Sequence, residues 1–361
     1  MSTDVEQEEY LPSPCKLVAT LFASSISQDD IEKTISALQD IIDESDPADF
    51  SYRYLSSINH RPHETDRPGR QQAVDVSFSS RARGISLKWL RRHDRLLRLE
   101  RECNVEMVLQ EADEWRKEKR LAVFDMDSTL IEQEVIDELA RVIGVEDEVS
   151  VCPPVTIPRN SSNNSPLANQ RITARAMNGE LDFTASLRAR VALLQGVPGA
   201  DVWDHLKSNV ITFTPGAREL CRALKRKGFK LAVLSGGFTP LADWVKQELG
   251  LDYAYANNLV LDPETSLLTG QVTGPIVDAT HKAELLEQIA QREQIPLHQT
   301  IAVGDGANDL LMMRKAGVGV AFNAKESVKI AAPTKLTSPT LLDILYILGY
   351  TKTEQDELLR S

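Results

Sequence analysis

Cysteine is scarce in this sequence, and the few cysteines present lie far apart. Only four occur among 361 residues, at Cys15, Cys103, Cys152 and Cys221. None of them forms the closely spaced pairs that zinc sites or redox motifs require, which argues against a scaffold held together by metal or disulfides. We therefore expect reduced thiols, most of them buried.

Positive charge is also in deficit. Lys and Arg number 41 against 53 Asp and Glu, which gives a net charge of -12. General binding to nucleic acids or anionic membranes needs a cationic surface, so the balance argues against both classes. Small anionic substrates stay possible.

No export or membrane-spanning pattern is visible. The first ten residues, MSTDVEQEEY, are acidic and lack the apolar stretch of a leader. The apolar-rich piece from Leu341 to Tyr350 reaches only about half the length of a spanning helix. The expected location is therefore the cytoplasm.

What is present is the composition of a soluble globular protein, with 42% hydrophobic and 26% charged residues. At roughly 100 to 200 residues per domain, the length suffices for two domains. Residues 1–115 predict the order β-α-β-β-α-β of a ferredoxin-like α+β domain, which resembles the ACT-type domains that bind amino acids or mediate dimers. We expect this domain to be regulatory or to form a homodimer. The expected elements are strands at 16–23, 51–58, 73–80 and 105–109 and helices at 28–41 and 86–101.

Residues 119–350 read differently, because short apolar runs alternate with helical patterns. The runs 121–124, 229–234, 300–303 and 317–322 are continuous, as expected for parallel strands covered by helices on both faces. This predicts an α/β fold, a Rossmann-like three-layer parallel sheet, with a helical cap inserted at about 132–207. Within the cap, residues 150–170 are rich in Pro, Ser and Asn and predict a surface loop.

Polar residues follow three of these strands directly. The segments are Asp125-Met126-Asp127-Ser128-Thr129, Ser235-Gly236-Gly237 and Gly304-Asp305-Gly306-Ala307-Asn308-Asp309. Each alone has an ordinary explanation as a helix cap or a tight turn. Ligands of parallel sheets bind outside the carboxyl ends of the strands, so we expect the three segments to converge on one crevice.

Several carboxylates at one sheet edge would repel one another unless protonation or a cation compensates. No His or Cys accompanies them, which favours a hard divalent cation with oxygen ligands, Mg²⁺ in the simplest case. A metal-dependent site is therefore expected at this edge.

In this order, and with Lys282 between the second and third segments, these residues resemble the four motifs of the haloacid dehalogenase superfamily. Within it, residues 119–345 are similar to the phosphoserine phosphatase family, through FDMDSTLIEQEVIDELA, GELDFTASLRARVALLQGV, VLSGGFTPLADWV and VGDGANDLLMM. The resemblance implies a Mg²⁺-dependent phosphomonoester hydrolase that converts O-phosphoserine to L-serine and phosphate in serine biosynthesis.

The resemblance also implies roles for individual residues. Asp125 would attack phosphorus and form an aspartyl-phosphate, and Asp127 would act as acid and then as base. The metal ligands would be the carboxylates of Asp125 and Asp305 and the backbone carbonyl of Asp127. The phosphate ligands would be Ser235, Gly236, Lys282 and Asn308, with Asp309 orienting them. For the substrate amino acid, the implied residues are Glu134 for the ammonium, Arg190 for the carboxylate, and Met177 and Phe183 as an apolar wall.

Two other interpretations stay open from the sequence. The same chemistry would serve another small phosphomonoester, because the motif residues after the strands contact only phosphate. Alternatively, the chain would be an amino-acid sensor whose catalytic half is vestigial, which the intact acidic motifs disfavour.

Overall fold

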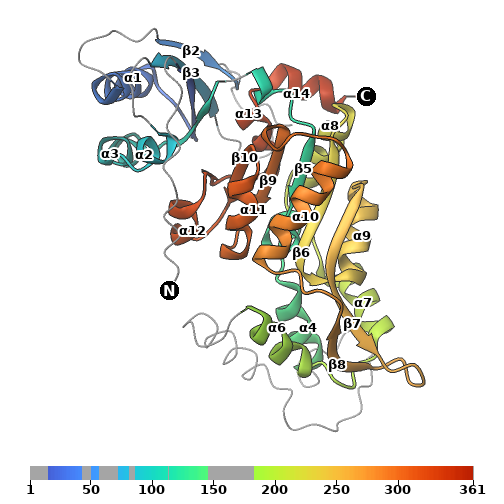
Figure 1. Ribbon diagram of the computed structural model, residues 1–361. Helices are drawn as coiled ribbons and strands as arrows, with labels where there is room; N and C mark the ends of the chain where they lie inside the picture. Colours follow the sequence, from blue (N-terminus) through green and yellow to red (C-terminus); the bar gives the residue numbers. More distant parts are fainter. Residues whose placement is uncertain are drawn as a thin grey trace.

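The protein contains two sheets (Figure 1). One buried hydrophobic cluster lies within the first sheet unit and two belong to the second, and Phe22 and Val108 of the first sheet pack into one of the latter. The computed structural model describes residues 15–42, 50–56, 72–80, 86–112, 114–144 and 183–360, and the statements below concern these residues. None of the helices in these ranges has the length and apolar character needed to cross a membrane.

The N-terminal sheet has four antiparallel strands in the order β2-β3-β1-β4. The buried faces of β1, β3 and β4 and of the helices form one core, which contains Leu17, Ile31, Leu38, Val76 and Leu99. The elements are β1 (Cys15–Ala23), α1 (Gln28–Ile42), β2 (Phe50–Tyr54), β3 (Gln72–Ser80), α2 (Leu87–Arg91), α3 (Asp94–Cys103) and β4 (Glu106–Glu111).

The element order agrees with the sequence-based expectation, with one difference in the second helix. The expected helix over 86–101 is two helices, because the chain turns at Arg92 and His93. The His93 imidazole caps α3 by accepting a hydrogen bond from the Arg95 amide at 3.3 Å. The ACT-like character of this part stays a prediction, as do the domain boundaries.

The second sheet has seven strands in the order β11-β10-β9-β5-β6-β7-β8, parallel except for β8. The four predicted strands correspond to β5 (Leu121–Phe124), β6 (Lys230–Phe238), β9 (Thr300–Gly304) and β10 (Val318–Phe322). The sequence did not predict β7 (Tyr253–Leu261), β8 (Leu268–Thr273) or β11 (Thr334–Leu336). These three lie toward the edges of the sheet, where one face meets water and no continuous apolar run forms.

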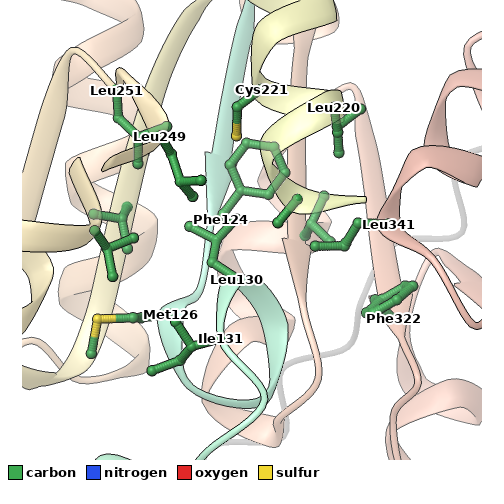
Figure 2. Packing of buried hydrophobic residues seen from close by; sticks show 14 of the residues in the cluster. Phe124, Met126, Leu130, Ile131, Leu220, Cys221, Leu249, Leu251, Phe322 and Leu341 are labelled. Atoms are coloured by element: carbon green, nitrogen blue, oxygen red, sulfur yellow. The ribbon is translucent and has the colours of Figure 1, made fainter. Parts of the chain in front are cut away.

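Helices cover both faces of this sheet, and β5 shows how. Phe124 points toward Leu220 and Cys221 of α8 in one core (Figure 2), whereas Leu121 and Val123 belong to a core on the other face. The helices are α8 (Ala217–Arg226), α9 (Thr239–Leu249), α10 (Ala279–Arg292), α11 (Leu310–Lys315), α12 (Glu326–Ala331), α13 (Ile344–Ile347) and α14 (Lys352–Leu359).

Between β5 and β6 the chain forms α4 (Val135–Gly144), α6 (Phe183–Ala192) and α7 (Gly199–His205). In Figure 1, α4 and α6 lie at the end of the long sheet that is remote from the N-terminal sheet. The expected cap helices fall in this region, and the 150–170 loop lies outside the described residues.

A buried ion pair joins the two sheets. Arg116, in a single helical turn (Glu114–Arg116), donates to both Asp75 carboxylate oxygens at 2.7 and 2.9 Å. Their side chains are 11% and 3% exposed. The same guanidinium donates to the Ile347 carbonyl at 2.9 Å, which also accepts from Gln110 at 2.8 Å. The two units are therefore fixed to one another by directional bonds as well as by apolar contact.

Candidate active site

The loops after β5 and β9 bring acidic side chains together. One carboxylate oxygen each from Asp125, Asp305 and Asp309 lies within 4.8 Å of the others. Asp125 and Asp309 are buried, while Asp305 is partly exposed. The convergence expected at the carboxyl ends of the strands is thus present for the first and third segments.

Buried apolar side chains fix the turn that carries Asp125. Met126, Leu130 and Ile131 are fully buried and lie in the core below Phe124 (Figure 2). The Met126 amide donates to Asp125 Oδ1 at 2.8 Å, which holds the carboxylate against the start of the turn. The same short segment therefore contains both candidate site residues and residues of the hydrophobic core.

Lys282 lies in the middle of the acidic group. It comes from the first turn of α10 and is completely buried. Its Nζ lies 2.7 Å from Asp125 Oδ1 and 2.7 Å from Asp309 Oδ1. Burial lowers the pKa of Lys282, but the two carboxylates more than offset this and raise it above its usual value, so the ammonium stays charged.

Asp309 has both oxygens engaged. Its Oδ1 accepts from Lys282, and its Oδ2 accepts from the Gly306 amide at 3.0 Å. Burial and the charge of Asp125 raise its pKa to about 7. Asp309 therefore fixes the positions of the Lys282 ammonium and of the turn that follows β9.

Asp127 and Asp305 both have raised pKa values. Burial, followed by the charges of Glu134 and Asp125, raises the pKa of Asp127 well above 3.8. Asp127 Oδ1 is buried and has no hydrogen-bond partner among the described residues. Burial and the charges of Asp125 and Asp309 raise the pKa of Asp305 to about 8. Burial and mutual repulsion thus favour the protonated form of both carboxyls, and a nearby cation would favour the charged form.

These residues fit a divalent metal ion. The donors are hard carboxylate oxygens, as Mg²⁺ and similar ions prefer, with no nitrogen or sulfur in the described cluster. The raised pKa of Asp305 reflects burial and then repulsion by neighbouring carboxylates, and a bound cation would offset both. Because both oxygens of Asp309 are engaged, Asp125 and Asp305 are the carboxylates better placed to bind such an ion.

The second segment, Ser235-Gly236-Gly237 at the end of β6, has the features of an oxyanion-binding loop. The Ser235 side chain is fully buried, and its Oγ accepts from the Gly237 amide at 2.8 Å, so the hydroxyl proton is left to donate elsewhere. A side chain at Gly237 would meet Asp127 Oδ2 at 3.2 Å, and one at Gly236 would meet the Phe183 ring at 3.0 Å. A Cβ at either position would thus be tightly packed, and a neighbouring side chain would have to shift by a few tenths of an ångström.

The cap contributes side chains on the opposite side of this loop. Phe183 begins α6 and touches Gly236, and Arg190 lies near the other end of the same helix. Arg190 Nε is buried without a hydrogen-bond partner among the described residues, and burial lowers the pKa of its guanidinium. Glu134 lies at an exposed edge of the site and accepts from the Ser128 hydroxyl at 2.9 Å.

Of the remaining expected site residues, Asn308 is partly buried in the turn after Asp305. Met177 lies outside the described residues. Two residues of the predicted segments, Ser128 and Gly237, were given no role of their own from the sequence. Ser128 adopts a left-handed backbone with φ 53° and holds Glu134. Gly237 holds Ser235 and packs on Asp127; its position directly after Gly236 was the available signal.

Comparison with known proteins assigns the family. Residues 119–317, more than half of the chain, match the family of haloacid dehalogenase-like hydrolases, and the chain belongs to it. Within this family, the relatives to which the chain is similar are phosphoserine phosphatases. The probable phosphoserine phosphatase of Schizosaccharomyces pombe is 46% identical over 262 residues, which cover 72% of this chain and 78% of that protein.

Two further comparisons agree. The phosphoserine phosphatase of Saccharomyces cerevisiae is 45% identical over 251 residues, covering 70% of this chain and 74% of that protein. A solved structure, described as a phospho-aspartyl intermediate analogue of phosphoserine phosphatase, is 40% identical with a TM-score of 0.53. It covers 63% of this chain and 98% of its own.

Proposed function

We propose that this protein hydrolyses O-phosphoserine to L-serine and phosphate, the last step of L-serine biosynthesis, through an aspartyl-phosphate on Asp125. The observation that carries the proposal is the contact of Asp125 with the buried Lys282 at 2.7 Å, beside Asp305 and two residues before Asp127, whose pKa is raised by burial. The solved relative described as a phospho-aspartyl intermediate analogue supports the same covalent route.

Asp125 is suited to be the nucleophile. Its Oδ1 accepts from the Met126 amide and lies 2.7 Å from Lys282 Nζ, which fixes the orientation of the carboxylate. A carboxylate nucleophile needs no general base to activate it. The Lys282 ammonium lies beside the carboxylate and offsets part of the negative charge that would otherwise repel a phosphate dianion.

Asp127 is suited to be the acid and then the base. Its raised pKa supplies a proton for the departing serine oxygen, and the resulting carboxylate then takes a proton from the water that hydrolyses the aspartyl-phosphate. The unpartnered Oδ1 is the atom that we assign to this transfer. A protonated carboxylic acid is needed because the serine alkoxide is a poor leaving group.

Binding of the phosphoryl oxygens falls to the Ser235 hydroxyl, the Gly236 amide, Lys282 and Asn308. The Asp125 and Asp305 carboxylates and the Asp127 carbonyl would hold the divalent metal, which we propose to be Mg²⁺. When bound, this cation would neutralise charge between the nucleophile and the phosphoryl oxygens.

Recognition of the amino acid comes from the cap. The buried, unpartnered Nε of Arg190 suits the substrate carboxylate, and the Glu134 carboxylate suits its ammonium. Phe183, in contact with Gly236, and Met177 would form the apolar wall between them. A cytoplasmic location and a homodimer formed through the N-terminal domain are further proposals, and gel filtration with light scattering tests the latter.

The test of the proposed substrate uses two arginines of the same helix. Arg190→Ala should raise KM for O-phosphoserine by about 10- to 100-fold, because a charge-assisted hydrogen bond is lost. Hydrolysis of p-nitrophenyl phosphate, which has no amino-acid carboxylate, should change by less than about twofold. Arg188 is exposed on α6, so Arg188→Ala is the matched control and should leave both substrates unaffected. Equal losses on both substrates in Arg190→Ala would contradict serine recognition.

A further inference from the structure

The ladder between β6 and β7 is interrupted at the phosphate-binding loop. Pairing proceeds through Leu234 opposite Tyr255 and resumes only at Phe238 opposite Asn257. Three residues of β6, numbered 235–237, thus lie opposite a single residue of β7. Such an irregularity takes backbone groups of the loop out of the ladder, and a buried backbone carbonyl then needs another donor.

The Asn257 side chain supplies that donor. Its Nδ2 donates to the Gly236 carbonyl at 2.8 Å, and its Oδ1 accepts from the Val277 amide at 2.9 Å. The residue is 1% exposed. Because one neighbour is a carbonyl and the other an amide N–H, only one orientation of the carboxamide satisfies both.

Asn257 thereby links two elements that we assign to phosphate binding. Gly236 belongs to the oxyanion loop, and Val277 directly precedes Asp278, the residue that caps α10. The Asp278 carbonyl accepts from the Lys282 amide at 2.9 Å, so the Val277 position sets the start of the helical turn that carries Lys282. Among the hydrogen bonds of the described residues, no other one links the Gly236 loop to the start of α10.

We propose that Asn257 is a positioning residue for phosphate: it fixes the spacing between the Gly236 amide and Lys282 without touching the substrate itself. This inference rests on the proposed roles of Ser235, Gly236 and Lys282. Loss of the side chain leaves the partly buried Gly236 carbonyl and the buried Val277 amide unpaired, and both elements shift to find partners. The metal-binding carboxylates of Asp125 and Asp305 receive no hydrogen bond from Asn257, so metal affinity should be preserved.

The experiment compares Asn257 with its neighbour Asn258, which is exposed on the same strand. Asn257→Ala should lower kcat/KM for p-nitrophenyl phosphate by about 10- to 100-fold and should raise the inhibition constant of inorganic phosphate by a similar factor. The Mg²⁺ concentration at half-maximal activity should stay within about twofold of the wild type. Asn258→Ala should leave all three quantities unchanged.

A second variant keeps the test valid if Asn257→Ala does not fold. Asn257→Asp retains size and polarity but places an oxygen against the Gly236 carbonyl, so the same weakening of phosphate inhibition is expected. A lower melting temperature with unchanged phosphate inhibition in both variants would overturn the inference, because it would show a structural role only. Ser235→Ala distinguishes failure of the positioning role of Asn257 from failure of the proposed phosphate site. If phosphate inhibition is unaffected in that variant as well, the proposed phosphate site itself fails.

Discussion

The ammonium of Lys282 lies 2.7 Å from Asp125 Oδ1 and the same distance from Asp309 Oδ1. One fully buried cation is therefore shared by two carboxylates that come from different strand ends. This arrangement neutralises part of the acidic cluster and leaves Asp305 as the group whose charge is most open to compensation by a metal ion.

The first prediction concerns the nucleophile. Asp125→Asn should reduce turnover of O-phosphoserine by at least about 1,000-fold, because an amide cannot form the aspartyl-phosphate. The fold should persist, since the Asn side chain has the same shape and can still accept from the Met126 amide. Phosphate release measures the first effect and thermal unfolding the second. Folded Asp125→Asn protein that retains hydrolysis would disprove the covalent route.

The second prediction separates the two roles of Asp127. In Asp127→Asn, p-nitrophenyl phosphate should still phosphorylate Asp125, because p-nitrophenolate leaves without a proton donor. The water step should stall for lack of a base. Stopped-flow absorbance should therefore show a burst of about one equivalent of p-nitrophenolate per active site, followed by very slow turnover. No such burst is expected with Asp125→Asn, which serves as the control.

The third prediction links metal removal to pH. Asp305 has a pKa of about 8 in the metal-free fold against an ordinary 3.8. The folded state thus binds more protons than the unfolded state, and this contribution to stability is lost as pH rises through the window from about 4 to about 8. A bound cation favours the charged carboxylate instead. The rise in melting temperature caused by Mg²⁺ should therefore be larger at pH 8 than at pH 5.

Thermal unfolding with EDTA or Mg²⁺ at each pH measures this difference. Asp305→Asn should reduce the pH dependence, since the amide does not titrate, whereas Asp309, with a pKa of about 7, still contributes in the same range. A Mg²⁺ effect that is equal at pH 5 and pH 8 in the unsubstituted protein would contradict the assignment of Asp305 as a ligand.

The fourth prediction concerns the junction between the two sheets. Arg116→Met should lower the free energy of unfolding by about 3 kcal/mol, because it leaves the buried Asp75 carboxylate without its bidentate partner. The ion pair between Lys117 and Glu354 is the natural comparison, since these side chains are 34% and 40% exposed. Lys117→Ala should cost less than about 1 kcal/mol. Urea titration measures both, and similar losses in the two variants would show that burial does not strengthen the Arg116 contact.

Much of the catalytic sheet follows from local sequence. The apolar runs 121–124, 229–234, 300–303 and 317–322 lie in β5, β6, β9 and β10, as expected of parallel strands covered on both faces, and polar segments follow three of these runs directly. The edge strands were not predictable in this way. In β7 the residues are mostly half-buried, and β11 has only three residues, so neither produces a clear hydrophobic pattern.

The site residues also divide into those that local sequence predicts and those that it does not. The motif carboxylates and the Ser-Gly-Gly loop are contiguous with strand ends and could be found from sequence. Asn257 and the Arg116 to Asp75 pair could not, because their partners lie far along the chain and no local pattern marks them.

The sequence by itself determined the chemical groups and the strand ends on which they stand, because local hydrophobic patterns and the geometry of parallel sheets suffice for that. Only the tertiary structure decided that Lys282 is fully buried between Asp125 and Asp309, that Asp127 and Asp305 have raised pKa values, and that Asn257 joins the Gly236 loop to α10. These properties depend on distances and on the exclusion of water, which arise when segments remote in sequence pack against one another.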